Sequence, residues 1–262
     1  MIEVSPTKLD VWLECPFRYR LKYIDRVAVD GTWAHLSMGN AIHGALREWF
    51  DIDESERLPS RGAELVREQW SALGFMDADQ SAQWREIAAS MVEGYCRQHP
   101  APYPFGRERT LSALGTAVRV RGRIDRIDER DGELVIVDYK TGKLVPTDDD
   151  ARVSRALAMY AAVAQRALRR PTWEVELHHV PSGVIARHRH TSESLSRQMS
   201  RVESIGRDIS AAEDSGDDGH FPARPGSLCA WCDFRDHCPD SATVAAVPRW
   251  AGLPESRSDL DS

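Results

Sequence analysis

Two stretches decide the fold of this chain: GRID at residues 122–125 and LVIVDYKTG at residues 134–142. The second stretch begins with four apolar residues, as expected of a central strand, and continues into Asp138 and Lys140. These two side chains share one face because side chains alternate along a strand. The Asp131-Gly132 pair supplies a hairpin turn that brings Asp125 to the corresponding region of the neighbouring strand. The hairpin is therefore expected to gather two carboxylates and a lysine.

Neighbouring carboxylates repel each other unless a cation lies between them. Magnesium favours oxygen ligands, retains several waters and stabilises charge on a phosphate. A nearby lysine can orient or deprotonate an attacking water if its pKa is depressed, or it can neutralise charge on a phosphorane. The alternative interpretation is a cross-strand Asp–Lys ion pair, because the D-x-K pattern alone occurs often by chance.

The remaining sequence pattern predicts a mixed central sheet with helices on its faces, an α/β fold. Helices are expected at 9–24, 38–50, 62–73, 81–98, 151–169 and 192–212, and strands at 107–114, 116–128, 133–140, 173–180 and 184–190. We expect one domain over residues 1–241. Its parts are a helical portion at 1–104, a catalytic core at 105–212 and a cysteine segment at 213–241, followed by a flexible tail at 242–262.

Net charge and hydropathy exclude few classes of protein. The formal net charge of -7 argues mildly against a protein that coats nucleic acid, although runs of arginine and of aspartate alternate along the chain. No apolar run approaches the roughly 18 residues that span a bilayer, and the start lacks the pattern of a secretory signal. We therefore expect a cytoplasmic protein without a membrane partner.

Three cysteines near the end of the chain, Cys229, Cys232 and Cys238, form a C-x2-C-x5-C pattern. A metal site needs a fourth ligand, for which His237 and the distant Cys15 are candidates. Ligation by His237 is sterically awkward because it directly adjoins Cys238. Thiolate ligands at tetrahedral geometry suit either zinc or an iron–sulfur cluster, so the residue types alone do not separate the two.

The GRID and DYKTG stretches, in this strand order, resemble the core signature of the RecB-like branch of the PD-(D/E)XK nucleases, which have a restriction-endonuclease-like fold. The resemblance implies that Asp125 and Asp138 bind Mg²⁺ or Mn²⁺ and that Lys140 completes the active site. It also implies that the backbone carbonyl of Tyr139 adds a metal ligand. Upstream, the G-x-x-x-H pattern ending at His43 resembles the extra metal ligand of this branch; a surface or core histidine is the alternative.

Cys15 lies in the sequence CPFRYR at residues 15–20. Together with the three late cysteines, this context resembles the iron–sulfur nucleases, which include the AddB nuclease domain and the CRISPR-associated RecB-like exonucleases. The resemblance implies a [4Fe–4S] cluster bound by Cys15, Cys229, Cys232 and Cys238, with zinc as the alternative. Such a cluster would join the two ends of the domain.

Five further positions are candidate DNA contacts or bear on the family pattern. Tyr160 occupies the tyrosine of a Q-x-x-x-Y motif in which Ala156 replaces the glutamine. Tyr160, Arg18 and Arg20 are candidate DNA contacts, with a half-buried tyrosine and a solvated helix face as the alternatives. Glu108 stands where related enzymes often have a glutamate, and a surface ion pair is an equal alternative.

The sequence therefore predicts a Mg²⁺- or Mn²⁺-dependent deoxyribonuclease, an exonuclease that acts on single strands or ends in repair, recombination or defence. No helicase motif is present, so unwinding would come from a helicase or repair partner. Two alternatives stay open. One is a catalytically inactive nucleic-acid-binding module of the same fold, motivated by Ala156, and the other is a zinc-stabilised interaction domain.

Overall fold

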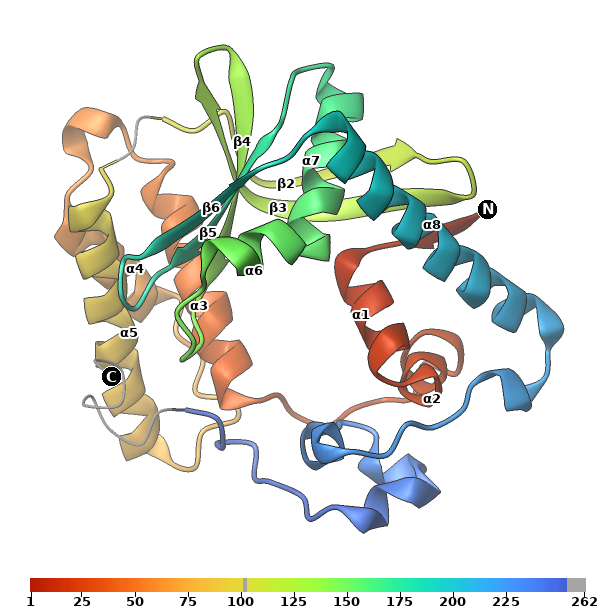
Figure 1. The fold of residues 1–262 in the computed structure, drawn as a ribbon. Helices are drawn as coiled ribbons and strands as arrows, with labels where there is room; N and C mark the ends of the chain where they lie inside the picture. Colours follow the sequence, from red (N-terminus) through yellow and green to blue (C-terminus); the bar gives the residue numbers. More distant parts are fainter. Residues whose placement is uncertain (101–102, 254–262) are drawn as a thin grey trace.

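The computed structural model describes residues 1–100 and 103–253, and its centre is a six-stranded mixed sheet with helices on both faces (Figure 1). The strands are β1 (Ile2–Val4), β2 (Gly106–Leu114), β3 (Val118–Arg130), β4 (Glu133–Lys140), β5 (Glu174–His179) and β6 (Ile185–Arg189). The helices are α1 (Pro6–Glu14), α2 (Pro16–Tyr19), α3 (Ala34–Trp49), α4 (Pro59–Glu68), α5 (Ala78–Gln98), α6 (Asp148–Val153), α7 (Arg155–Leu168) and α8 (Ser192–Ser215). This arrangement confirms the predicted mixed α/β fold.

The core has two layers, one on each side of the sheet. Helices α3, α4 and α5 cover one face, and Val137 and Tyr139 of β4 pack into this layer together with Trp49 of α3. Helices α1, α7 and α8 cover the other face, where Ile124 and Ile136 pack against α7. The alternating side chains of β4 thus contribute to both layers, as expected of a strand that is buried on both faces.

The sheet divides along one edge of β3. Strand β2 pairs with β3 from Arg119 to Ile127 on one edge. On the opposite edge, β1 pairs in parallel with residues 118–120, and β4 pairs antiparallel with residues 126–130. Within the described chain, residues 121–125 have no strand partner on this edge. Asp125 therefore lies at an opening in the sheet, where its side chain can be reached from the surface.

The predicted helix over residues 9–24 is divided at Cys15. Ser5 caps α1 as the sequence suggests, with its Oγ accepting a hydrogen bond from the backbone N–H of Lys8 at 3.2 Å. Cys15 then adopts an extended conformation, because the following Pro16 disfavours helical geometry at the residue before it. The break turns Cys15 into the N-cap of α2 and brings its thiol to the surface of the helical pair.

Other differences concern the boundaries of one predicted helix and a strand that was not predicted. The predicted helix at 151–169 begins earlier, at the Thr147 cap of α6, and is interrupted at Ser154, which caps α7. Strand β1 was not predicted, because three residues are too short to show a period. It is held by parallel pairing with β3, a long-range contact that leaves no local signal.

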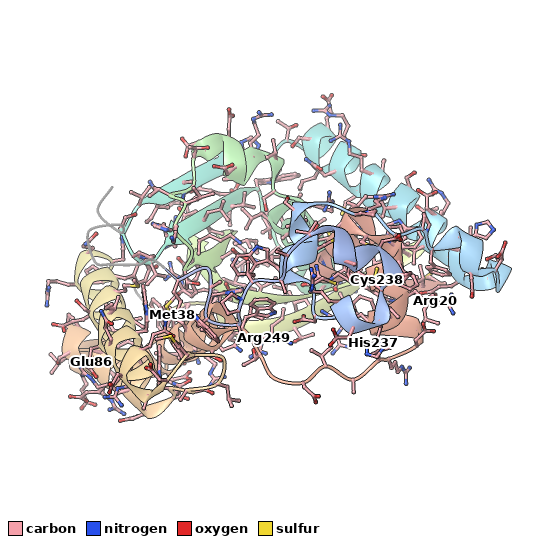
Figure 2. All side chains as sticks on the ribbon, turned by 90° about the horizontal axis from the view of Figure 1, so that it is seen from below. Arg20, Met38, Glu86, His237, Cys238 and Arg249 are labelled. Atoms are coloured by element: carbon pink, nitrogen blue, oxygen red, sulfur yellow. The ribbon has the colours of Figure 1, made fainter. Side chains whose placement is uncertain are left out.

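The segment after the cysteines packs against the helical portion. The backbone N–H of Ala34 donates to the carbonyl of Arg249 at 3.0 Å, and the Arg249 side chain donates to Asp233 at 2.6 Å. Leu253 is buried. These contacts involve residues that the sequence assigns to a flexible tail, whereas the rest of that tail, 254–262, lies outside the described residues. Figure 2 shows Arg249 and, on the cysteine segment beside the N-terminal helices, Cys238.

None of the helices within residues 1–100 and 103–253 is both long and apolar enough to cross a membrane.

A buried polar network ties β5 to the neighbouring elements. Glu176 and His178 are almost fully buried, and His178 Nε2 lies 2.8 Å from Glu176 Oε2. The hydroxyl of Tyr95 lies 2.6 Å from His178 Nδ1, and Arg130 forms two hydrogen bonds to the Glu176 carboxylate, at 2.8 and 3.0 Å. Burial, only partly offset by Glu176, lowers the pKa of His178 to about 4. Burial would raise the pKa of Glu176, but hydrogen bonds from His178, Arg130 and Arg187 hold it well below its usual value.

These shifts predict acid destabilisation. Below pH 6.5 an unfolded histidine binds a proton, whereas folded His178 stays neutral until about pH 4. The contribution of His178 is therefore lost as the pH falls from 6.5 to 4, with a maximal slope of roughly 1.4 kcal/mol per pH unit. The pKa of Glu176 is also lowered in the folded protein, so its contribution to stability is likewise lost as the pH falls below the usual pKa of a glutamate. Urea unfolding at a series of pH values should show this loss, and His178→Gln should reduce the slope. An unchanged slope in the variant would contradict this account.

Candidate active site

The opening between β3 and β4 holds the predicted carboxylates and lysine. Asp125, Asp138, Tyr139 and Lys140 all line one cavity of about 990 Å³. Lys140 Nζ lies 2.7 Å from Asp138 Oδ2, so the alternation along β4 pairs these two side chains as expected. The backbone N–H of Tyr139 donates to Asp125 Oδ2 at 2.9 Å, which fixes the first carboxylate against the end of β4. The structure thus brings these four residues together.

His43 reaches the same cavity from α3. Its Nδ1 lies 3.3 Å from Asp125 Oδ1, and its ring packs edge-to-face on Tyr139 with centroids 5.8 Å apart. Burial alone would lower the pKa of His43, but the hydrogen bond to Asp125 and the charges of Asp125, Asp138 and Glu108 raise it. The histidine that the G-x-x-x-H pattern singled out therefore faces the carboxylates rather than solvent or the core.

Glu108 joins this group, a role that the sequence left open. Its backbone has φ of 45°, in the left-handed region that a residue with a side chain rarely adopts. The β2–β3 pairing includes Arg107 and Arg109 but not Glu108. One ligand atom each of His43, Glu108 and Asp125 lies within 4.8 Å of the others. Glu108 also forms an ion pair with Arg123. No sequence signal marks a left-handed glutamate, so its exact placement could not be predicted.

The charges in the cavity favour a bound cation. Burial and the charge of Asp125 raise the pKa of Asp138, against the opposing effect of Lys140. Burial and Asp125 likewise raise the pKa of Glu108. Asp138 Oδ2 is buried, and the Lys140 ammonium lies 2.7 Å from it. Carboxylate oxygens with one imidazole nitrogen are ligands suited to Mg²⁺ and, still better, Mn²⁺, so the donor set fits a divalent metal.

A buried arginine holds Tyr139 of the site in place. Arg126 is only 2% exposed, and it donates to Asp128 Oδ2 at 3.0 Å and to the hydroxyl of Tyr139 at 3.1 Å. It thereby holds the ring of Tyr139, on which His43 packs. Sequence analysis did not identify Arg126, because nothing in the local pattern separates it from the exposed Arg123 nearby.

Tyr160 of α7 packs on the glycine of the GRID stretch. A Cβ atom placed on Gly122 would lie only 2.5 Å from Tyr160 Cε1, so a larger residue here would displace the ring or the strand. The ring lies in a second cavity that adjoins the first. The tyrosine of the Q-x-x-x-Y pattern therefore keeps a defined place although Ala156 replaces the glutamine.

Arg18 and Arg20 lie apart from the carboxylates. Arg18 pairs with Glu14 at 2.8 Å and lines a cavity with Cys15. Arg20 pairs with Asp25 at 3.1 Å and with Asp218 at 2.5 Å. Neither arginine lines the carboxylate cavity, and their contact with DNA stays a prediction.

The four cysteines of the predicted cluster line a separate cavity of about 190 Å³. The backbone N–H of Arg18 donates to Cys15 Sγ at 3.4 Å, and that of Gly226 donates to Cys229 Sγ at 3.4 Å. His237 is exposed and does not line this cavity. Among the described residues, no three of the thiols lie within 4.8 Å of one another.

Metal binding at the carboxylates can be tested without an activity assay. Mn²⁺ should raise the melting temperature of the wild-type protein, because a ligand at a hundred times its Kd stabilises the folded state by roughly 2.7 kcal/mol. Asp125→Asn should abolish most of this shift, and Glu108→Gln should reduce it. Asp149→Asn, at an exposed position in α6, is the matched control and should shift like the wild type. Equal Mn²⁺ shifts in all four proteins would exclude this cavity as the metal site.

Comparison with known proteins agrees with the geometry of the site. Residues 3–239 match the family model of the PD-(D/E)XK nuclease superfamily. The crystal structure of a candidate exonuclease from Eubacterium rectale covers 98% of this chain, and this chain covers 91% of it, with 13% sequence identity and a TM-score of 0.52. The crystal structure of SSO0001 aligns over 92% of this chain and 88% of its own at 13% identity, but its TM-score of 0.40 is too low to carry an argument. No curated protein sequence matches.

Proposed function

This chain belongs to the PD-(D/E)XK nuclease superfamily, and from that membership we propose that it is a Mg²⁺- or Mn²⁺-dependent deoxyribonuclease that degrades DNA from its ends. The observation that carries the proposal is the convergence of Asp125, Asp138 and Lys140 with His43 and Glu108 in one open cavity. Its volume of about 990 Å³ can admit a strand of nucleic acid. The end-directed mode follows the resemblance of the sequence motifs to RecB-like exonucleases.

We assign roles to the residues of the cavity as follows. Asp125 and Asp138, with His43, Glu108 and the backbone carbonyl of Tyr139, would hold the metal, which would supply Lewis-acid stabilisation of charge on the phosphate. Burial lowers the pKa of Lys140, but the ion pair with Asp138 and the charge of Asp125 raise it. With its ammonium 2.7 Å from Asp138, Lys140 would supply positive charge beside the phosphate.

The nuclease proposal is tested with end-labelled single- and double-stranded DNA in the presence of Mg²⁺ or Mn²⁺. The wild type should produce a ladder of shortened products, and Lys140→Ala should lower kcat by at least about 100-fold, the usual effect of removing one electrostatic stabiliser. Lys143→Ala removes the same charge from the same cavity, but Lys143 is not paired with either carboxylate in the described contacts, so its kcat should stay near wild type. Melting curves confirm that each variant is folded.

Binding of DNA without turnover by a folded wild type would instead favour the inactive binding module. The missing glutamine at Ala156 motivates that alternative. Cleavage of single strands alone would point to a helicase or repair partner that supplies unwound DNA. We propose that the enzyme acts in the cytoplasm, in DNA repair, recombination or defence.

We further propose that the four cysteines hold a [4Fe–4S] cluster. The proposal is supported by the cavity that Cys15 shares with Cys229, Cys232 and Cys238, at the junction of the two chain ends. A single tetrahedral zinc ion with Zn–S bonds of about 2.3 Å would place the four sulfurs roughly 3.8 Å apart. Among the described residues no three of the thiols lie within 4.8 Å of one another, so the choice of the cluster over zinc rests on the resemblance of the cysteine pattern to the iron–sulfur nucleases.

Metal analysis of protein purified without oxygen tests the cluster. We expect about four iron atoms per chain, the stoichiometry of a [4Fe–4S] centre, with broad visible absorbance. Cys15→Ala should lose the iron and melt at a lower temperature, because the link between the chain ends is then broken. Cys96→Ala is the control, since Cys96 is buried in α5 outside the cysteine cavity, and it should keep its iron. Stoichiometric zinc without iron would contradict the proposal.

A further inference from the structure

A second cavity, of about 750 Å³, lies along the unpaired edge of β3. Its lining includes Thr7, Lys8, Thr110, Arg121, Arg123 and Tyr160. Two of these residues, Thr7 and Arg123, also line the carboxylate cavity. The two cavities therefore adjoin at Thr7 and Arg123, and we refer to them together as the groove.

Two arginines of β3, Arg121 and Arg123, line the groove, and Arg119 continues the same row along the strand beyond the lining residues. Arg119, Arg121 and Arg123 are exposed, and they alternate with buried residues of β3, so they project from one face of the strand. Neighbouring members of the row are roughly 6.6 Å apart along the strand. This spacing is similar to that of successive phosphates in an extended nucleic-acid strand. The row ends two residues before Asp125, beside the proposed place of hydrolysis.

The arginines of the row are exposed to solvent. The side chains of Arg121 and Arg123 are 57% and 61% exposed, and Arg123 also forms the ion pair with the less exposed Glu108. Arg121 NH1 lies 3.5 Å from Glu3, but both partners are exposed, and such a pair contributes little to stability. Lys8 adds a further positive charge at the rim. In a chain with a net charge of -7, this row concentrates positive charge at the groove that includes the carboxylate cavity.

We propose that this arginine row binds the sugar–phosphate backbone of a single nucleic-acid strand next to the phosphate that is cleaved. The inference rests on the proposed nuclease function and adds to it where the substrate lies. A single strand fits better than a duplex, because the cations follow one line along one β-strand, whereas a duplex presents its phosphates on two strands across a groove. Stacking of a base on the Tyr160 ring, which lines the same cavity, would further favour an unpaired strand.

The test measures binding of fluorescent oligo-dT by anisotropy, with Ca²⁺ in place of Mg²⁺ to suppress turnover. Arg119→Gln and Arg121→Gln should each raise the Kd for a 20-mer roughly three- to tenfold, the loss of one exposed charge-assisted hydrogen bond. Each should also lower the slope of log Kd against log salt by about 0.7, the value for one single-strand phosphate contact. The defect should be smaller for a trimer, which is too short to reach the whole row.

Arg201→Gln is the matched control. Arg201 is exposed on α8 and belongs neither to the β3 row nor to the lining of either cavity, so both Kd and salt slope should equal those of the wild type. If the two groove variants also bind like the wild type, the inference is overturned.

The same set of proteins separates this inference from the nuclease proposal. If the wild type does not cut DNA but the groove variants lose affinity and salt slope, the proposed chemistry fails and the strand-binding row stands. If the wild type cuts DNA and the groove variants keep their affinity, the row alone is wrong. Tighter binding of duplex than of single strands, with the same loss in the variants, would overturn the single-strand assignment.

Discussion

The repulsion between Asp125 and Asp138 is the constraint on which the site depends. Two carboxylates that share a partly buried cavity destabilise each other unless positive charge lies close by. Lys140 and His43 supply part of that charge, at 2.7 Å from Asp138 and 3.3 Å from Asp125, respectively. Burial first, and then the charge of Asp125, still raise the pKa of Asp138 despite these two cations. A divalent cation would complete the compensation, and the same cation would activate a phosphodiester for hydrolysis.

The fold holds this unfavourable pair in place through the division of the sheet. Because β1 and β4 both pair with the same edge of β3, but at its two ends, the segment between them stays open. Asp125 is fixed there by the N–H of Tyr139, and Tyr139 is fixed in turn by Arg126. Arg126 also packs on Phe50, with its guanidinium carbon 4.8 Å from the ring centroid, and pairs with Asp128. Removing one partner of such a buried pair typically costs about 3–5 kcal/mol, so this support is rigid.

Local sequence patterns predicted the parts of the structure that depend on local physics. The apolar run of β4, the turn before it and the Ser5 cap specify their own geometry, and the D-x-K alternation placed Asp138 beside Lys140. The convergence of Asp125 with them followed from the hairpin. His43 was selected through its family pattern, since a histidine on an amphipathic helix carries no signal of what it will face.

Features that depend on long-range contacts or on an unusual backbone conformation could not be predicted from local sequence patterns. Strand β1 is too short to show a period, and the left-handed backbone of Glu108 contradicts the preference of its residue type. The burial of Arg126 depends on Phe50 and Tyr139, which come from separate elements. The groove beside β3 depends on where α1 begins relative to an unpaired strand edge, and the arginine pattern alone did not reveal it.

Anomalous diffraction from crystals soaked in Mn²⁺ tests the central claim most directly. The account predicts one strong anomalous peak between Asp125 and Asp138, within about 2.2 Å of a carboxylate oxygen of each, with His43 Nδ1 or Nε2 as a further ligand. Asp138→Asn crystals should lose the peak while keeping the same fold. A peak elsewhere, or an empty cavity in which Lys140 alone bridges the carboxylates at saturating Mn²⁺, would contradict a metal-dependent nuclease centre at this site.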